Sequence, residues 1–304
     1  MAHELVYTSA AHGLRPGTRG FCTVAHTRGM QPRTVQLLEA LSCYKSAVAP
    51  HEGRAESSPV SWSHYRAQFL GRASSVLSRV CAASPDHTSR SNKLAHHLLV
   101  GQGEQPAGGP AWLCAQEGLF LESWEDEPHL IESPRALPAG DETDCRASEW
   151  EALTGDGGHA GALASSFLRH PDHVTVLVVT PETEALSLIR EALRLLPPRE
   201  RWNVTFNTYF TSLPAGATCA WRCMLADSDE LRELRRHPRM EILDLTRPLP
   251  EPDGADALVR RARSGEAPPS EPPATAGPEA PAGNGFRLLA PRRINQVSLR
   301  PRGR

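Results

Sequence analysis

One cysteine and three histidines are the side chains of this sequence best suited to nucleophilic chemistry. Cys22 precedes His26 by four residues, so both would lie on one face of a strand, and His96 and His97 follow much later. A cysteine hydrolase needs a thiol within hydrogen-bond reach of an imidazole. Nothing local, such as a helix that begins directly after Cys22, would lower the pKa of its thiol. A small buried cysteine in a half-buried strand is therefore favoured over a nucleophile.

A second group of polar residues is a candidate ligand or partner pocket. The polar residues 86–92 come directly before the apolar segment that contains His96 and His97. Arg90, Asn92, His96 and His97 are the candidate pocket residues, because binding residues concentrate on loops held by a scaffold. Adjacent histidines on a strand point to opposite faces, so we expect one buried and one exposed, and no shared metal ion. Polar side chains that hold a loop through hydrogen bonds are the alternative.

The other motifs indicate neither a metal site nor a cofactor site. The seven cysteines are scattered, and Cys219 and Cys223 would share one strand face instead of forming the close pair of a zinc ribbon. Residues 155–160 match G-x-G-x-x-A, but a dinucleotide-binding fingerprint needs a strand directly before it, and residues 148–153 have a helical pattern. We expect no metal and no cofactor, and a glycine-rich turn between two helices at residues 155–160.

The composition favours a cytoplasmic protein with reduced thiols. The 304 residues carry a net charge of −2, and 39% of them are apolar, so nothing global indicates a specific nucleic-acid partner. Lys45 and Lys93 are the only lysines, which is typical of a GC-rich bacterial genome, so abundant arginine need not indicate phosphate recognition. Met1–Ser9 does not resemble a signal peptide, and no apolar run approaches the ~20 residues of a transmembrane span.

Hydrophobic periodicity predicts a mixed α/β (α+β) fold in which a strand-rich N-terminal half packs with a small layered α/β C-terminal half. In the first half the pattern predicts strands at 3–9 and 21–26, a helix at 34–41, a hairpin of 63–70 with 74–82, and a strand or short helix at 93–100. In the second half it predicts a helix at 159–169, a buried strand at 174–179, a helix from Thr180-Pro181 to 196, a hairpin of 202–210 with 219–225, a helix at 228–237 and a strand at 240–245.

The sequence pattern that indicates folded elements ends after Arg247. We expect one ordered region over 1–247, with a candidate internal boundary at 134–145, where Pro, Gly and acidic residues concentrate. Residues 248–304 are rich in Pro, Ala and Gly, and 258–263 would form one helical turn at most, so this segment is predicted to be a disordered linker. Its end, 287–304, carries six arginines and no acid, which favours weak contact with anionic surfaces.

Three stretches resemble a known protein family. They are residues 3–10 with 20–30 (HELVYTSA and GFCTVAHTRGM), residues 90–98 (RSNKLAHHL) and residues 199–223 (RERWNVTFNTYFTSLPAGATCAWRC). They resemble the N-terminal domain of the bacterial, planctomycete-type GTPase-associated proteins, over roughly residues 1–248. The resemblance implies a part in a GTPase-centred signalling or biological conflict system, and it supplies no active-site residues. Larger members of the family continue into middle and C-terminal domains.

These observations predict a non-enzymatic adaptor or regulatory module that binds a partner protein such as a GTPase. The resemblance, the weak catalytic candidates and the linker-like tail favour this function. A cysteine hydrolase that uses Cys22 with His26, His96 or His97 is one alternative. A nucleotide-binding or small-ligand-binding domain in the second half of the chain is the other.

Overall fold

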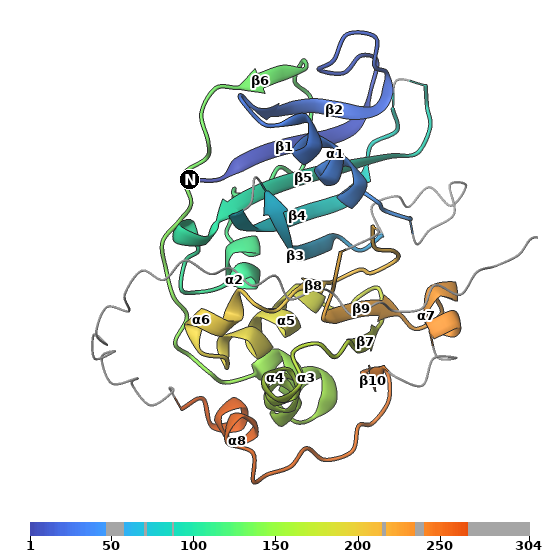
Figure 1. The fold of residues 1–304 in the computed structure, drawn as a ribbon. Coiled ribbons are helices and arrows are strands. Elements are labelled where there is room, and N and C mark those ends of the chain that lie inside the picture. The colour runs from blue at the N-terminus through green and yellow to red at the C-terminus, as the bar shows by residue number, and fades with distance from the viewer. Residues whose placement is uncertain (47–57, 70–71, 87, 215–216, 235–239, 267–304) are drawn as a thin grey trace, which may run out of the picture. The chain divides into compact units, whose positions relative to one another are not determined.

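A computed structural model describes residues 1–46, 58–69, 72–86, 88–214, 217–234 and 240–266. Within these residues one ten-stranded sheet runs through both halves of the chain, in the order β10-β7-β9-β8-β3-β4-β5-β1-β2-β6 (Figure 1). The strands are β1 (His3–Ala10), β2 (Gly20–Thr27), β3 (Ser61–Phe69), β4 (Arg72–Ala83), β5 (Asn92–Gly101), β6 (His129–Ile131), β7 (Thr175–Val179), β8 (Phe206–Asn207), β9 (Trp221–Leu225) and β10 (Glu241–Asp244). The helices are α1 (Pro32–Leu41), α2 (Pro110–Cys114), α3 (Ser148–Thr154), α4 (Gly158–Arg169), α5 (Ala185–Arg194), α6 (Pro198–Arg201), α7 (Asp229–Leu234) and α8 (Ala257–Ser264).

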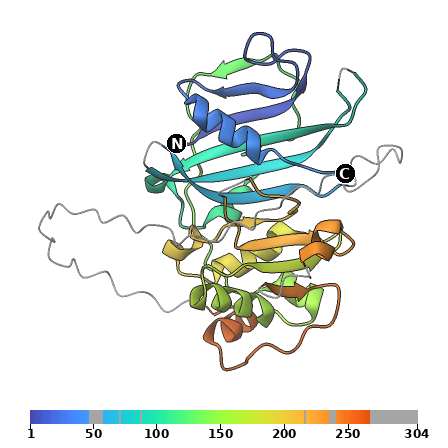
Figure 2. The same cartoon turned by 45° about the vertical axis from the view of Figure 1, so that its right-hand side comes forward.

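The N-terminal half is an antiparallel sheet with α1 on one face. β3, β4, β5, β1 and β2 pair in that order, and β6 joins the outer edge of β2 in parallel. Figure 2 shows α1 lying across this sheet. Val35, Leu38 and Leu41 recur every three residues and pack with Leu5 of β1, because that spacing keeps apolar side chains on one side of a helix. The predicted strands, hairpin and helix of this half are confirmed.

The C-terminal half is a parallel sheet that is covered on both sides. β10, β7, β9 and β8 are all parallel, and every residue of β7 is buried. Val176 and Val178 pack with Leu231 of α7, whereas Leu177 packs on the opposite face with Ile189 of α5. A continuous apolar run is the pattern expected of a strand buried on both faces. The predicted mixed α/β fold with two packed halves is confirmed.

The two halves meet at β3 and β8. Ser63 pairs with Asn207 and His64 with Phe206, in antiparallel register. The predicted hairpin of residues 202–210 with 219–225 is wrong, since β8 runs parallel to β9 and antiparallel to β3. Alternating apolar residues identify an extended segment, but they determine neither the direction in which it pairs nor its second partner strand.

The helix predicted to begin at Thr180-Pro181 begins instead at Ala185, after Glu184 as N-cap. The amide of Thr180 donates to the Thr183 hydroxyl at 3.2 Å, which forms a turn before the helix. Thr180 therefore organises a loop and does not cap the helix, because its own hydroxyl also lies 3.2 Å from that of Thr183.

Three arginines of the second half hold the segment that connects the halves. Arg201, which is buried, donates to Asp141 at 2.6 Å and to the carbonyl of Ala107 at 2.9 Å. Arg190 contacts both carboxylate oxygens of Glu142, at 2.9 and 2.7 Å, and Arg194 contacts the same side chain at 3.2 Å. Planar guanidinium groups suit such forked contacts. The connecting segment is therefore fixed onto α5 and α6.

The described chain stays ordered beyond residue 247, where α8 packs on α4. Asp256 caps α8 by accepting a hydrogen bond from the amide of Leu258 at 2.8 Å, and Val259 and Ala262 are buried. A Cβ atom added to Gly161 would lie 2.4 Å from the Leu258 carbonyl, so the glycine permits the close approach. The expectation of one turn at most in 258–263 is wrong, because a cap and two buried side chains stabilise this helix. The prediction for the basic end falls on residues 267–304, which lie outside the described residues.

Candidate functional site

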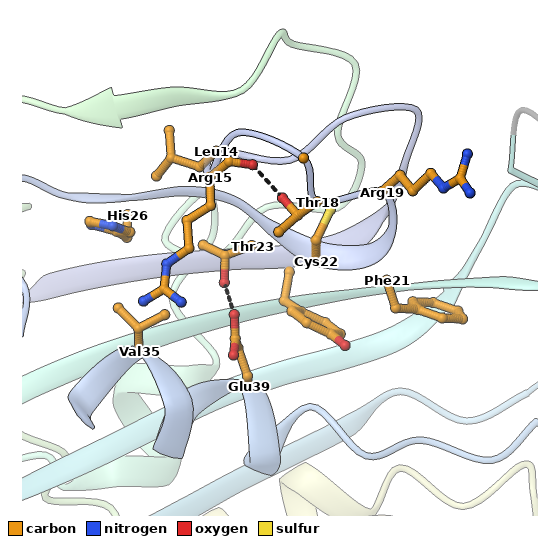
Figure 3. Close-up of a pocket in the computed structure, with 12 residues that line it drawn as sticks. Leu14, Arg15, Thr18, Arg19, Phe21, Cys22, Thr23, His26, Val35 and Glu39 are labelled. Carbon is orange, nitrogen blue, oxygen red and sulfur yellow. Dashed lines mark hydrogen bonds between the residues drawn. The ribbon is translucent and has the colours of Figure 1, made fainter. Parts of the chain in front are cut away.

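A cavity of about 400 Å³ lies where β2, the loop before it and α1 meet (Figure 3). Cys22 and His26 line it, together with Arg15, Arg19 and Glu39. The four residues that the sequence suggested as a pocket, Arg90, Asn92, His96 and His97, do not line this cavity. The cavity is therefore built mainly from side chains that the sequence motifs did not single out.

The loop before β2 is a tight turn that presents two arginines. The amide of Gly13 donates to the carbonyl of Thr18 at 3.0 Å, and the Thr18 hydroxyl donates to the carbonyl of Arg15 at 2.7 Å. Gly17 adopts a φ of +82°, which glycine reaches without strain. The backbone of Leu14 also donates to the carbonyl of Thr23, so the loop is attached to β2 and its arginines project from a fixed base.

A β-bulge in β2 changes which side chains share a face. Val6 of β1 pairs with Ala25, but the next residue, Tyr7, pairs with Thr23. Val24 is therefore an extra residue on β2. Such an insertion reverses the alternation of side chains on the bulged strand.

Because of this bulge, the prediction that Cys22 and His26 share one face is wrong. His26 pairs with Leu5, which packs under α1, whereas Cys22 packs with Val6 on the opposite face. No hydrogen bond joins these two described side chains; the His26 Nδ1 atom instead lies 2.9 Å from the carbonyl of Thr27. The cavity thus contains a thiol and an imidazole that approach it from different faces of β2.

The environment of Cys22 favours the protonated thiol. Its Sγ donates to the carbonyl of Gly20 at 3.1 Å, and only 7% of the residue is exposed. Burial has the largest effect and raises the pKa of the Cys22 thiol; hydrogen bonds from Ala10 and Thr18 lower it by less, and the Glu39 carboxylate adds a smaller effect in the direction of burial. A reactive cysteine needs an environment that lowers the pKa of its thiol. Cys22 has the opposite environment.

The walls of the cavity combine cations with an exposed aromatic ring. Among the ion pairs of the described residues, none involves Arg15 or Arg19. Glu39 of α1 accepts a hydrogen bond from the Thr23 hydroxyl at 2.7 Å. Phe21 is 48% exposed. These features are typical of a binding surface.

Tyr7 and Lys93 extend the aromatic wall. The Phe21 ring is stacked on that of Tyr7 with centroids 6.3 Å apart, and the Lys93 ammonium lies 5.1 Å from the Phe21 centroid. Burial lowers the pKa of Lys93. A cation held over an aromatic ring stabilises the orientation of that ring.

His96 is fully buried and both of its nitrogens are occupied. The amide of Leu121 donates to Nδ1 at 3.0 Å, so Nε2 carries the proton and donates to the Glu4 carboxylate at 3.0 Å. Arg135 donates to the same carboxylate at 2.9 Å. Burial lowers the pKa of His96, whereas the pKa of Glu4 is lowered by His96 and Arg135 against the effect of its own burial. The arrangement is a neutral imidazole that holds a charged carboxylate.

His97 is also fully buried, on the opposite face under α1. The Ser42 hydroxyl donates to the carbonyl of Leu38 at 3.0 Å and so accepts from the His97 Nε2 atom at 2.8 Å. Nδ1 accepts from the Ser78 hydroxyl at 2.7 Å. Burial lowers the pKa of His97 to about 3, and nearby His96 adds to this effect. The expectation that one of the two histidines is exposed is wrong, because both faces of β5 are covered.

A third buried histidine, His64, was not singled out from the sequence. Its Nδ1 atom lies 2.7 Å from the carbonyl of Val204, and its Nε2 atom lies 2.9 Å from the Ser75 hydroxyl. Burial lowers the pKa of His64 to about 4. It joins β3 to the segment before β8, and no local signal distinguishes it from a surface histidine on a half-buried strand.

Arg90 and Asn92 belong to a hydrogen-bonded loop. The Asp86 carboxylate accepts from the backbone amide of Arg90 at 3.1 Å and from the Ser9 hydroxyl at 2.7 Å. A hydrogen bond from Thr88, with that from Ser9, holds the pKa of Asp86 well below its usual range. The Asn92 side chain accepts from the amide of Ser9 at 3.0 Å. These contacts fix the entry to β5, and they do not bring Arg90 and Asn92 together with His96 and His97.

The remaining motifs have structural roles. Cys219 and Cys223 are fully buried, and burial raises the pKa of Cys219 to about 12. All seven cysteines lie in the described part of the chain, and each is a free thiol. Gly155 ends α3 in the left-handed conformation with φ of +83°, so the G-x-G-x-x-A match is a turn between two helices, as predicted.

The described residues contain neither a metal-binding cluster nor a helix that could span a membrane. No group of three or more His, Cys, Asp or Glu side chains is placed to hold a metal ion there. Within the same residues, every helix is too short or too polar to cross a lipid bilayer.

The structure defines a class of protein in which an antiparallel N-terminal domain and a parallel β/α domain share one sheet. Residues 1–137 match the family model described as GTPase-associated protein 1, N-terminal domain type 2, and residues 147–247 match GTPase-associated protein 1, middle domain. The chain belongs to the GTPase-associated protein 1 family. Comparisons with curated proteins and with solved structures gave no match.

The matches change how the second half is assigned. The resemblance assigned roughly residues 1–248 to an N-terminal domain, whereas residues 147–247 match the middle domain of the family. The stretch at 199–223 on which the resemblance partly rested therefore belongs to the middle domain. α8 lies beyond both matches but packs on α4 of the middle domain.

Proposed function

We propose that the chain is a non-enzymatic adaptor or regulatory module that binds a partner protein, a GTPase, in a cytoplasmic signalling or conflict system. Family membership links the chain to GTPases. The main support for a non-enzymatic role is that both ring nitrogens of His96 and of His97 are hydrogen-bonded to partners inside the fold. Neither ring can accept a proton from a nucleophile without breaking a buried hydrogen bond.

The environment of Cys22 weighs against the cysteine hydrolase. A nucleophilic cysteine works as a thiolate beside a base that takes its proton. Cys22 instead donates to a backbone carbonyl, and its pKa is raised by burial. His26 approaches the cavity from the other face of β2. Cavity residues of this kind suit binding better than proton transfer.

The connection between the halves supports a scaffolding role. The halves share one sheet through β3 and β8, and the segment between them is bound by Arg190, Arg194 and Arg201. An adaptor presents a partner surface in one fixed geometry, and a rigid surface reduces the ordering entropy lost on binding. A shared sheet with a fixed connection provides that rigidity.

The test is capture of the partner by the full chain in the cells from which the chain comes. Tagged chain is cross-linked in those cells, purified, and its bound proteins are identified by mass spectrometry against a tag-only control. The proposal expects a GTPase among the enriched proteins. Enrichment of no GTPase contradicts it, as does turnover of any substrate that is abolished by Cys22→Ala or His96→Ala.

A further inference from the structure

The cavity beside β2 is lined by charges of both signs. Figure 3 shows Arg15 extending from the loop toward α1 and Val35, while Arg19 extends in the other direction, on the same side of the view as Phe21. The Thr23 to Glu39 hydrogen bond lies between them in this view. Two cations and one carboxylate therefore line the same cavity, and in this view the carboxylate lies between the cations.

The two arginines are available to a ligand. Both are exposed, and neither forms an ion pair or a side-chain hydrogen bond with any described residue. Elsewhere in this chain Arg28, Arg135 and Arg190 form ion pairs with acidic side chains, so their guanidinium groups are already occupied. The turn that ends in Thr18 holds the backbone that carries Arg15 and Arg19, so little additional backbone entropy is lost when these side chains bind a ligand.

The aromatic wall supplies an apolar contact next to Arg19. Phe21 is one of four large apolar side chains that are exposed among the described residues. Its stacking on Tyr7 and the Lys93 ammonium 5.1 Å from its centroid hold the ring in place while leaving 48% of the residue in solvent. Exposed aromatic rings beside arginines are enriched at the centres of protein interfaces.

From this arrangement we infer that the groove lined by Arg15, Glu39, Arg19 and Phe21 binds an extended acidic segment of the partner protein. The segment carries two separated carboxylates, one for each arginine, a hydrogen-bond donor between them for Glu39, and an apolar side chain for Phe21. The inference rests on the proposed adaptor function and identifies the surface through which it would operate.

The separation of the cations favours a peptide over a nucleotide. Phosphate groups are recognised by donors that converge on one point, as forked arginines or a helix N-terminus do. Here Arg15 and Arg19 diverge, and the Glu39 carboxylate between them would repel a phosphate chain. An extended peptide, whose side chains are spaced along its backbone, can place a carboxylate at each end.

Fluorescence anisotropy with the full chain tests this inference. The probes are labelled peptides with one Phe, a central Ser and two acidic residues at varied spacing, and matched peptides in which Asn or Gln replaces the acids. The variants are Arg15→Glu with Arg19→Glu and, separately, Phe21→Ser. The matched control is Arg66→Glu, which reverses an exposed arginine on β3 outside the cavity. Circular dichroism confirms that each variant is folded.

We expect at least one acidic peptide to bind wild type and Arg66→Glu alike, and to bind the double variant about tenfold more weakly. Added salt should weaken binding, because exposed charges are screened. The inference is overturned if no acidic peptide binds more tightly than its amide counterpart, if the double variant binds as wild type does, or if GTP or inorganic phosphate occupies the groove and excludes every peptide. Capture of a GTPase by wild type and the double variant equally would leave the adaptor function standing and remove only the groove.

Discussion

The His97 Nε2 atom lies 2.8 Å from the Ser42 hydroxyl, so β5 is joined to the C-terminal end of α1 by a buried hydrogen bond. Ser78 of β4 occupies the other nitrogen of the same ring. The imidazole thus connects two strands and a helix inside the core. A ring used in this way stabilises the N-terminal domain, and recognition is left to the cavity between β2, the loop before it and α1.

Replacing Ser78 should destabilise the fold through His97. In Ser78→Ala the buried Nδ1 atom loses its donor, which costs about 1–3 kcal/mol in free energy of unfolding. Ser74→Ala, on the same strand but with no side-chain hydrogen bond to a described residue, is the matched control and should change stability by less than about 0.5 kcal/mol. Chemical denaturation measures both. Equal effects of the two substitutions would show that the His97 contact does not stabilise the domain.

Stability should fall on mild acidification. The pKa of His97 is about 3 in the fold, against 6.5 for an ordinary histidine, and that of His64 is about 4. Between the pKa of each histidine in the fold and its pKa of 6.5 in the unfolded chain, the unfolded chain binds more protons than the folded chain. The contribution of these histidines to the free energy of unfolding is therefore fully present above pH 6.5, and it is lost as the pH falls below that value. His97 alone should account for roughly 2 kcal/mol between pH 7 and pH 5.

Thermal melts across this pH range separate the contribution of His97. His97→Gln should reduce the pH dependence, whereas His3→Gln, which changes an exposed histidine, should keep it. A wild-type melting temperature that is constant from pH 7 to pH 5 would contradict the claim that the buried imidazole rings stay neutral in the fold.

Docking of α8 should depend on Gly161. In Gly161→Ala the added methyl group would lie 2.4 Å from the Leu258 carbonyl, which forces α8 away from α4 and costs about 1–3 kcal/mol. Arg260, Arg261 and Arg263 would then become accessible to trypsin. Gly103→Ala, whose methyl group would meet no atom within 4 Å, is the control. Cleavage at the same rate in both variants would contradict the docking of this helix.

Cys43 should react with iodoacetamide before Cys22. Cys43 is exposed, whereas Cys22 is buried and burial raises the pKa of its thiol. Alkylation depends on the thiolate, so a buried thiol with a raised pKa reacts slowly. Peptide mass spectrometry over a time course at pH 7 follows each cysteine. Modification of Cys22 ahead of Cys43 would contradict a raised pKa of the Cys22 thiol and would support the hydrolase hypothesis.

The elements of this fold were predictable where burial follows a simple period. The continuous apolar run of β7 predicted a buried strand, and the three-residue spacing of apolar side chains in α1 predicted a helix. The pairing of β8 was not predictable in full, because this strand pairs antiparallel with β3, about 140 residues earlier in the chain, as well as parallel with β9. The bulge at Val24 has no signature in the sequence, yet it places Cys22 and His26 on opposite faces.

The candidate site was predictable only in part. Cys22 and His26 were identified as residues of interest, and both line the cavity. Arg15 and Arg19 looked like ordinary members of an arginine-rich composition. Their significance comes from the turn that holds them beside Phe21 and from the lack of acidic partners among the described residues. Those features are tertiary, and neither spacing nor residue type reveals them.

The most direct test of the account is the affinity of the purified full chain for the GTPase that it captures, measured by isothermal titration calorimetry. We predict binding by wild type and by Arg66→Glu with similar dissociation constants, and binding about tenfold weaker by the variant with Arg15→Glu and Arg19→Glu. Failure of wild type to bind contradicts the adaptor function. Equal affinities for all three chains contradict the groove as its binding surface.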